Sequence, residues 1–386
     1  MKTKNDNKNL NVPNLRFPEF DGEWEKVTLS KVVTRITRKN KNNESRLPLT
    51  ISAQYGLVDQ ISFFNKVVAS ADMSNYYLLK EGEFAYNKSY SSEYPWGAIK
   101  RLDRYPKGAL SSLYICFGIN DNIDSDFIMH YFESSKWHRE VSNIAGEGAR
   151  NHGLLNIAVG DFFNTAHYIP SNNKEQQKIA ALINLITVRI DTQIKIIEKL
   201  ESLIRGLYEK LFSVVDAKYL PLSNIVKIKK GQQINGEDLA EQGTYYVMNG
   251  GISPSGYLNN YNTPADTISI SEGGNSCGYV QYNYTPFWSG GHCYTLIESN
   301  DIINYKFLYH YLKHKEQSIM ALRIGSGLPN IQKKDLESFP ILYICREEQG
   351  KIVYMLDSLS AKINIERHIA LKYEEQKMYL LSNLFI

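Results

Sequence analysis

The clearest hydrophobic pattern in the chain is a seven-residue repeat of isoleucine and leucine between residues 176 and 212. A second apolar position lies between the members of the first, and Gln193 interrupts it. The stretch has no proline, and Gly206 is its one glycine. Such a repeat predicts a long helix whose apolar stripe must be buried by a partner helix. The predicted seam comprises Ile179, Ile183, Ile186, Ile190, Ile197, Leu200, Ile204, Leu207 and Leu211.

A second stretch near the C-terminal end carries a weaker version of the same seam, with Glu366 and Lys377 at seam positions. Its apolar members are Ile352, Leu356, Leu359, Ile363, Ala370, Tyr373, Leu380 and Leu384. We expect the two helices to pack antiparallel within one chain, with the polar seam residues fixing the register or facing another subunit. About 38 residues rising ~1.5 Å each would give a spacer of roughly 55 Å. An ordinary helical hairpin closing two domains is the alternative.

The chain also contains a long internal repeat. Residues 175–179 (EQQKI) align with residues 348–352 (EQGKI) at an offset of 173, and the alignment continues without a gap to the end of the chain. Further landmarks recur in the same order, namely residues 29–33 with 222–226, 127–132 with 307–312, and 156–161 with 330–335. We infer that the chain arose by duplication of one unit.

Upstream of each long helix, short β-like runs alternate with turns, and helical patches follow near residues 126–141 and 305–322. This pattern is typical of an α+β fold. We predict two tandem mixed α/β domains separated by two long antiparallel coiled-coil helices, with a pseudo-twofold internal repeat. The predicted segments are a tail (1–23), a first mixed domain (24–173), a first helix (174–215), a second mixed domain (216–343) and a second helix (344–386).

Composition narrows the class of protein. Hydrophobic residues make up 43% of the chain, which is enough to build folded cores. The net charge of +3 is small for a protein that depends on DNA phosphates alone. Residues 24–174 hold 18 basic and 15 acidic residues, whereas residues 216–343 hold 10 and 11. The sequence shows neither a secretory signal nor a run of ~18 apolar residues, so we expect a cytoplasmic protein.

Candidate chemistry is sparse. The four cysteines are scattered, and although Cys277, His292 and Cys293 could be imagined around a metal, buried cysteines and a satisfied histidine are the simpler interpretation. The sequence lacks a phosphate-binding GxxxxGK(S/T) loop, a Rossmann glycine motif, a Pro-Asp nuclease element and an Asn/Asp-Pro-Pro-aromatic methyltransferase element. We therefore expect no metal site and no catalytic site in this chain.

Several loops carry the amide, hydroxyl and guanidinium groups that base edges and phosphates accept, often beside glycines that let the backbone approach a ligand. An ordinary polar surface is the alternative for each of them. The candidate DNA-contacting residues are Arg38, Lys39, Lys88, Ser89, Tyr90, Arg101, Arg104, Arg150, Asn151, Gln232, Asn275, Ser276, Tyr279, Gln281, Arg323 and Ser326.

Two sequence features are distinctive when taken together. The first is residues 12–20 (VPNLRFPEF) followed by Trp24 and residues 27–30 (VTLS). The second is Ile169-Pro170 followed by residues 175–180 (EQQKIA), with a repeat of this helix opening near the C-terminal end. Together they resemble the specificity subunits of type I restriction-modification systems, the HsdS family. The second copy departs from the pattern, because Leu342-Tyr343 stands in place of Ile169-Pro170 and Gln349-Gly350 in place of the glutamine pair.

The resemblance implies a division of labour. Each mixed domain would be a target recognition domain that reads one half of a split, asymmetric double-stranded DNA sequence. The helices would set the gap and dock two modification subunits, which would bind S-adenosylmethionine and methylate adenine after flipping it out of the stack. Restriction subunits would supply ATP- and Mg²⁺-dependent translocation and cleavage. The alternative is a coiled-coil scaffold that binds proteins and no DNA.

Overall fold

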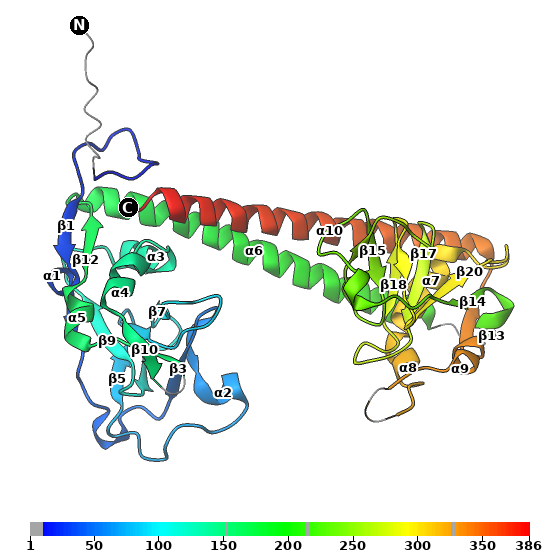
Figure 1. Ribbon diagram of the computed structural model, residues 1–386, viewed down its shortest axis with the longest axis horizontal. Coiled ribbons are helices and arrows are strands. Elements are labelled where there is room, and N and C mark those ends of the chain that lie inside the picture. Colours follow the sequence, from blue (N-terminus) through cyan, green and yellow to red (C-terminus); the bar gives the residue numbers. More distant parts are fainter. Residues whose placement is uncertain (1–10, 151–152, 214–216, 326, 328) are drawn as a thin grey trace, which may run out of the picture. The chain divides into compact units, whose positions relative to one another are not determined.

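The computed structural model describes residues 11–386 except 151–152, 214–216, 326 and 328. The chain divides into two compact units: unit 1 comprises residues 1–192 and 370–386, and unit 2 comprises residues 193–369. Each unit therefore contains part of both long helices, α6 (Asn173–Phe212) and α10 (Arg346–Asn383), which are drawn in green and in orange to red in Figure 1.

The first strand of unit 1 pairs with its last strand, so the two ends of the domain lie side by side. Strand β1 (Glu25–Thr28) pairs antiparallel with β12 (Ala166–Ile169), which leads into α6. A four-stranded antiparallel sheet follows, in the order β2-β9-β6-β7. A second sheet has the order β4-β3-β8-β5 and contains one parallel pair, β3 with β8. The strands are β2 (Val33–Arg35), β3 (Pro48–Ser52), β4 (Gly56–Asp59), β5 (Tyr77–Lys80), β6 (Phe84–Asn87), β7 (Ala98–Arg101), β8 (Lys107–Leu110) and β9 (Ile115–Ile119).

Helices cover the first sheet and join it to the long helices. The side chain of Asp124 caps α3, accepting a hydrogen bond from the backbone N–H of Phe127 at 2.8 Å. Aromatic rings of β6, β9, α3 and α5 form the core together with the first turns of α6 and the last turns of α10. The remaining elements are α1 (Leu29–Val32), a 3₁₀ turn (Lys41–Asn43), α2 (Gln60–Phe64), α3 (Ser125–Glu133), α4 (His138–Ile144), β10 (Gly146–Arg150), β11 (Leu154–Asn156) and α5 (Val159–Asn164).

Unit 2 repeats the main elements of this plan. Strand β13 (Lys218–Pro221) pairs with β21 (Pro340–Tyr343) as β1 pairs with β12, and the main sheet has the equivalent order β14-β20-β17-β18. The second sheet is smaller, in the order β16-β15-β19. The remaining elements of unit 2 are β14 (Lys227–Lys230), β15 (Tyr245–Met248), β16 (Tyr257–Leu258), β17 (Thr267–Ser271), β18 (Val280–Asn283), β19 (Trp288–Ser289), β20 (Cys293–Ile297), α7 (Tyr305–His314), α8 (Glu316–Met320), α9 (Lys333–Glu337) and two 3₁₀ turns (Leu222–Asn224 and Gly236–Asp238).

The tandem α+β architecture and the internal repeat are thus confirmed. The predicted helical patches are each divided in two, however. Near residue 134 the chain leaves the helix: Ser134 adopts an extended backbone, and its hydroxyl donates to the carbonyl of Tyr131 at 2.6 Å. Near residue 315 the break between α7 and α8 lies at Lys315.

Candidate nucleic-acid interface

Corresponding strands allow the two units to be compared residue by residue. In unit 1, Arg35 of β2 pairs with Phe117 of β9, which pairs with Phe84 of β6. In unit 2 the equivalent row consists of Ile228, Leu296 and Ile268. In each unit, the residue four places after the β6 or β17 member of this row is the first residue beyond the end of that strand.

That residue is Lys88 in unit 1 and Glu272 in unit 2. The carbonyl of Lys88 accepts from the backbone N–H of Leu155 at 2.9 Å, and the carbonyl of Glu272 accepts from that of Ile331 at 2.8 Å. The backbones are therefore held alike while the side chains carry opposite charges. This position distinguishes the two units chemically.

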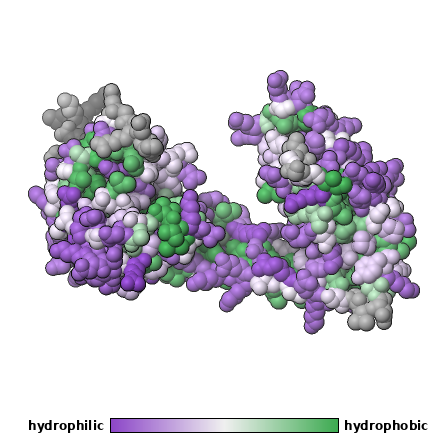
Figure 2. Space-filling view, turned by 90° about the horizontal axis from the view of Figure 1, so that it is seen from below, coloured by the Kyte–Doolittle hydropathy of each residue, from purple (hydrophilic) through white to green (hydrophobic). Residues whose placement is uncertain are grey.

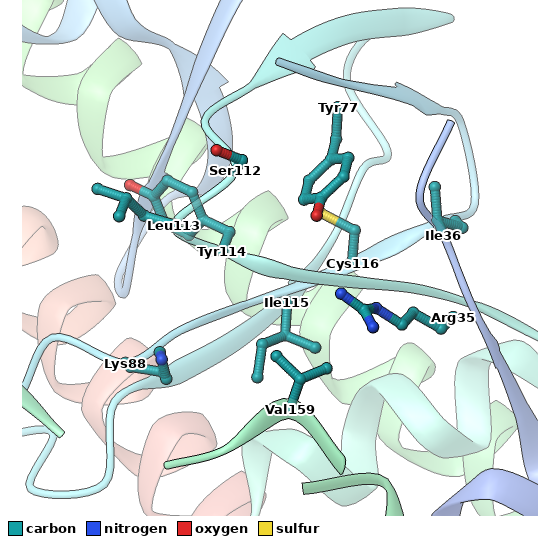
Figure 3. A pocket seen from close by; sticks show the side chains of 10 residues that line it. All are labelled: Arg35, Ile36, Tyr77, Lys88, Ser112, Leu113, Tyr114, Ile115, Cys116 and Val159. Atoms are coloured by element: carbon teal, nitrogen blue, oxygen red, sulfur yellow. The ribbon is translucent and has the colours of Figure 1, made fainter. Parts of the chain in front are cut away.

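The unit 1 member of the pair lines a small cavity of about 160 Å³, shown in Figure 3. Arg35 and Lys88 approach it from opposite sides, with Ile115 and Val159 between them. The ammonium group of Lys88 donates to the carbonyl of Ile157 at 3.3 Å. Two cationic groups beside a pocket of this size suit an acceptor-rich ligand such as a phosphate or the O6/N7 edge of guanine.

The unit 2 member lines a larger groove of about 570 Å³. Two glycine pairs, Gly250-Gly251 and Gly273-Gly274, contribute to its walls, together with Lys230 and His292. Gly250 lets its loop pack closely against the Gly273 loop, because a Cβ atom at Gly250 would lie 3.1 Å from the carbonyl oxygen of Gly273, whereas the backbone of Gly274, at a φ of +80°, has open space beside it. The groove therefore combines exposed backbone with charges of both signs.

Two of the arginines predicted to contact DNA are held in ion pairs. Arg38 binds both carboxylate oxygens of Glu83, at 2.9 and 2.6 Å. Arg101 binds Asp103 and Asp126, each at 2.6 Å, and its side chain is 14% exposed. Their roles as DNA contacts stay predictions, but any phosphate would compete with these carboxylates.

The other predicted contacts fall into three groups. Lys39 donates to the carbonyl of Asn75 and lies 4.3 Å above the ring of Tyr77, and Lys313 lies 4.1 Å above the ring of Tyr279. Asn151 and Ser326 lie outside the described residues, as does the side chain of Arg150. The remaining residues are exposed or partly exposed on loops or at strand ends: Ser89, Tyr90, Arg104, Gln232, Asn275, Ser276, Gln281 and Arg323.

Sequence reasoning did not single out an exposed aromatic cluster on unit 1. Phe63 and Phe64 of α2 are 44% and 45% exposed, and the ring of Tyr55 lies 6.5 Å from that of Phe63. Most of the molecular face in Figure 2 is hydrophilic, with hydrophobic residues gathered in separate patches. An exposed aromatic cluster is a common interaction surface, and nothing in the local sequence pattern separated it from buried apolar runs.

The residues that open each long helix tie it to its domain. The side-chain oxygen of Gln176 accepts from the backbone N–H of Asp124 at 2.8 Å, and its amide donates to the carbonyl of Pro170. Gln349 repeats this arrangement in unit 2, accepting from Asn304 at 2.6 Å and donating to the carbonyl of Ile344. The glutamines thus lock the entry of α6 and α10 against the helix caps of α3 and α7.

In unit 1 the N-terminal string meets the same helix opening. The guanidinium of Arg16 pairs with the buried carboxylate of Glu175 at 2.7 Å, and the indole N–H of Trp24 donates to that carboxylate at 3.2 Å. Lys178 lies 4.7 Å from the ring of Phe17. The two sequence features that carry the family resemblance are therefore one structural joint.

Each domain also contacts the helices through a buried histidine. His130 hydrogen-bonds Asn184 at 2.8 Å through Nε2, and His310 hydrogen-bonds Asp357 at 2.9 Å through Nε2. Asn184 and Asp357 occupy the same place in the repeat. Burial lowers the pKa of His310, and the carboxylate of Asp357 opposes that shift.

Two of the polar seam residues, Gln193 and Glu366, hydrogen-bond to each other. The side-chain amide of Gln193 donates to the carboxylate of Glu366, and also to the carbonyl of Glu366 at 3.3 Å. Gln193 and Glu366 are separated by 173 residues, so they are repeat mates. A residue that contacts its own mate is expected where two related antiparallel helices cross.

The third polar seam residue, Lys377, forms an ion pair with a residue of unit 1. Its ammonium lies 3.1 Å from the carboxylate of Glu133 on α3, which also hydrogen-bonds His130 at 3.0 Å. Burial would raise the pKa of Glu133, but the hydrogen bond with His130 and the charge of Lys377 lower it to about 2. The predicted apolar members of the seam are all buried or partly buried: Ile183, Ile186, Ile190, Ile197, Leu200, Ile204, Leu207, Leu211, Leu356, Leu359, Ile363, Tyr373, Leu380 and Leu384.

The described residues include no cluster of three or more histidine, cysteine or acidic side chains suited to a metal ion. Burial raises the pKa of the Cys293 thiol to about 11 and also raises that of Cys277, so both are poor thiolate ligands. Within the same described ranges, none of the helices has the length and apolar character needed to cross a membrane.

Comparison with known proteins relates part of the chain to type I specificity subunits. Residues 215–374 match the family model of the type I restriction modification DNA specificity domain. A type I specificity subunit of Mycoplasma pneumoniae is 37% identical over 144 residues, and one of Mycoplasma genitalium is 30% identical over 174 residues. These matches cover 37% and 43% of this chain and only 38% and 45% of the two relatives.

Solved structures match over nearly the whole chain. The S subunit of a type I restriction-modification system from M. genitalium superposes with a TM-score of 0.66 and 20% identity, covering 97% of this chain and 99% of that one. A chain from a second type I system, studied for its complex assembly and conformational transition, gives a TM-score of 0.58 at 15% identity, covering 95% and 98%. At these identities the likeness establishes the fold.

Proposed function

We propose that this chain is a specificity subunit of a type I restriction-modification system and that it reads a split, asymmetric DNA target for a methyltransferase and restriction complex. The match of residues 215–374 to the specificity domain, and the partial matches to two specificity subunits, support this proposal. Each mixed domain would be a target recognition domain for one half of the target. In this role the chain would supply sequence recognition and no catalysis.

The observation that carries this proposal is the combination of a repeated framework with different chemistry at the equivalent strand ends. Arg35 and Lys88 present cations in unit 1, whereas Glu272 presents a carboxylate in unit 2. Two domains that read the same sequence would need the same groups at this position. Their difference supports an asymmetric target, because cations match acceptor edges and carboxylates match amino groups.

The long helices are the proposed docking surface for modification subunits. In unit 2 an apolar groove of about 660 Å³ lies between α6 and α10, lined by Leu203, Leu207, Met355 and Leu359 among others. Tyr354 at its edge is 78% exposed. An exposed apolar groove of this size is suited to a protein partner. S-adenosylmethionine would bind to the modification subunits, and ATP and Mg²⁺ to the restriction subunits.

The function is tested by expressing the chain with its cognate modification subunit in a host that lacks adenine methylation. Mapping N6-methyladenine across the genome should reveal one split motif whose two halves differ. The modification subunit expressed alone is the control and should leave no motif. A stable complex that methylates no new site would favour the scaffold alternative and refute DNA reading.

A further inference from the structure

The glycine-lined groove of unit 2 contains a carboxylate oxygen without a hydrogen-bond partner. Glu272 is 8% exposed. Its Oε1 is well satisfied, because it accepts from Lys230 Nζ at 2.6 Å and from the Tyr294 hydroxyl at 3.0 Å. Its Oε2 has no hydrogen-bond partner among the described residues, and the Nδ1 atom of His292 lies 3.6 Å away.

A buried acceptor in this condition favours the binding of a donor. Leaving such a group unpaired destabilises the free protein, and a ligand N–H could remove that penalty. The side chain of His292 is 59% exposed, so a rotation of its imidazole can open Oε2 to the groove. Rotations of interface side chains on this scale are common on binding.

The surroundings favour a nucleobase as the source of the donor. The two glycine pairs allow close backbone approach, and Lys230, whose side chain is 52% exposed, can attract a phosphodiester chain. A carboxylate in such a setting matches the amino group that cytosine or adenine presents in the major groove.

We propose that Glu272 is a specificity-determining residue, and that its Oε2 accepts a hydrogen bond from the exocyclic amino group of a cytosine or an adenine at one position of the target. The inference rests on the proposed function and goes further by naming the group that is read. Lys230 and Tyr294 hold Oε1, so the orientation of the carboxylate is fixed before the base arrives.

That fixed orientation makes Glu272→Gln an informative variant. The Lys230 ammonium can only donate, so the amide oxygen must occupy the Oε1 position and the NH₂ group must occupy the Oε2 position. An acceptor toward the groove becomes a donor. The preferred base should change from one with an amino group to guanine or thymine, which present O6 or O4 at the corresponding edge.

The experiment measures methylation by the complex of this chain with its modification subunit. For the wild type, duplexes carry 2-pyrimidinone in place of each target cytosine, or purine in place of each target adenine other than those that accept the methyl group, so that single amino groups are removed. One such replacement should slow methylation roughly 10- to 100-fold, and its identity tells cytosine from adenine. Glu272→Gln should lose this penalty and prefer guanine or thymine at that position.

Matched variants separate the outcomes. Glu298→Gln makes the same charge change at an exposed residue that pairs with Lys227, and it should keep the wild-type motif. His292→Ala should keep the preference, because the imidazole only covers Oε2. Loss of the preference in His292→Ala but not in Glu272→Gln would overturn the proposal, since the imidazole would then be the reading group.

Two further results would also refute it. One is a wild-type complex that tolerates every amino-group replacement, a result that does not depend on whether any variant folds. The other is a Glu272→Gln complex with an unchanged motif. A wild-type complex that methylates no motif at all would instead refute the proposed function, and the inference would fall with it.

Discussion

Replacing Phe385 with alanine should destabilise unit 1 selectively. Phe385 lies two residues beyond the end of α10 and is 1% exposed. Its ring centroid lies 5.3 Å from that of Phe127 and 5.8 Å from that of Tyr131, both on α3. The aromatic side chain therefore fastens the end of a helix that begins in unit 2 to the core of unit 1.

The size of the effect follows from burial. Truncating a fully buried phenylalanine to alanine costs about 3–5 kcal/mol, because the transfer free energy is lost and a cavity remains. For a unit of this size each 1 kcal/mol lowers the melting temperature by about 2–4 °C. We therefore expect the melting transition of unit 1 to fall by roughly 10 °C.

Tryptophan fluorescence distinguishes the two units. Trp24, Trp96 and Trp137 lie in unit 1, and Trp24 contacts Phe127 at 5.9 Å, whereas Trp288 lies in unit 2. The fluorescence transition should therefore follow unit 1. The control is Met378→Ala on the same helix, because Met378 is 65% exposed and its truncation should change stability by less than about 0.5 kcal/mol.

The outcome that would refute this reasoning is a fluorescence transition in Phe385→Ala that matches the wild type within about 1 kcal/mol. That result would mean that the end of α10 does not contribute to the unit 1 core. An equal fall in Met378→Ala would also count against it, since the loss could then be ascribed to the helix as a whole.

Three further predictions concern buried polar groups. Burial lowers the pKa of His167 to about 4 from 6.5, so unit 1 should lose up to about 3 kcal/mol of stability as the pH falls from 6.5 to 4; urea unfolding should show this slope in the wild type, and His167→Gln should flatten it. Lys377→Met removes the cation that helps to keep the pKa of Glu133 near 2. The stability that Glu133 contributes is present above pH ~4.5 and is lost as the pH falls below it, so the variant should unfold at a higher pH than the wild type in an acid titration followed by circular dichroism. An unchanged acid transition would contradict this assignment. Glu366→Leu should lower the melting temperature because it leaves the Gln193 amide unpaired, and adding Gln193→Leu should restore it; equal effects of the single and double variants would show that the pair is not coupled.

The sequence was most informative where one local pattern decided the structure. The heptad spacing identified both long helices, because an apolar stripe with this spacing can be buried only by packing the helix against another element. The offset of 173 residues identified the duplication, and the contact between Gln193 and Glu366 is its direct structural expression. Periodicity could not show where a short helix stops, since the backbone turns to an extended conformation at Ser134 within a stretch whose apolar pattern continues.

The candidate DNA contacts were harder to predict for a physical reason. Whether an arginine is available depends on partners distant in the sequence: Arg38 meets Glu83 45 residues away, and Arg101 meets Asp126 25 residues away. Glu272 was not among the candidates because a carboxylate repels phosphate and therefore does not fit a search for cationic loops. Glu272 was recognised only when the strand pairing showed that it occupies the same position in unit 2 as Lys88 does in unit 1.

The two units together serve as an internal comparison of what the fold requires and what it leaves free. The helix-entry glutamines, the α3 and α7 histidines and the terminal aromatic residues make the same contacts twice: the ring of Phe212 lies 5.6 Å from Phe307, as that of Phe385 lies 5.3 Å from Phe127. These contacts form the joint between domain and helix, and a change in either copy would disturb packing. The strand-end position tolerates a lysine in one copy and a glutamate in the other while the backbone hydrogen bond beneath it is retained. A framework that holds the backbone independently of the side chain allows the group presented to a ligand to change without loss of the fold, which is the property that a protein needs in order to acquire a new recognition sequence.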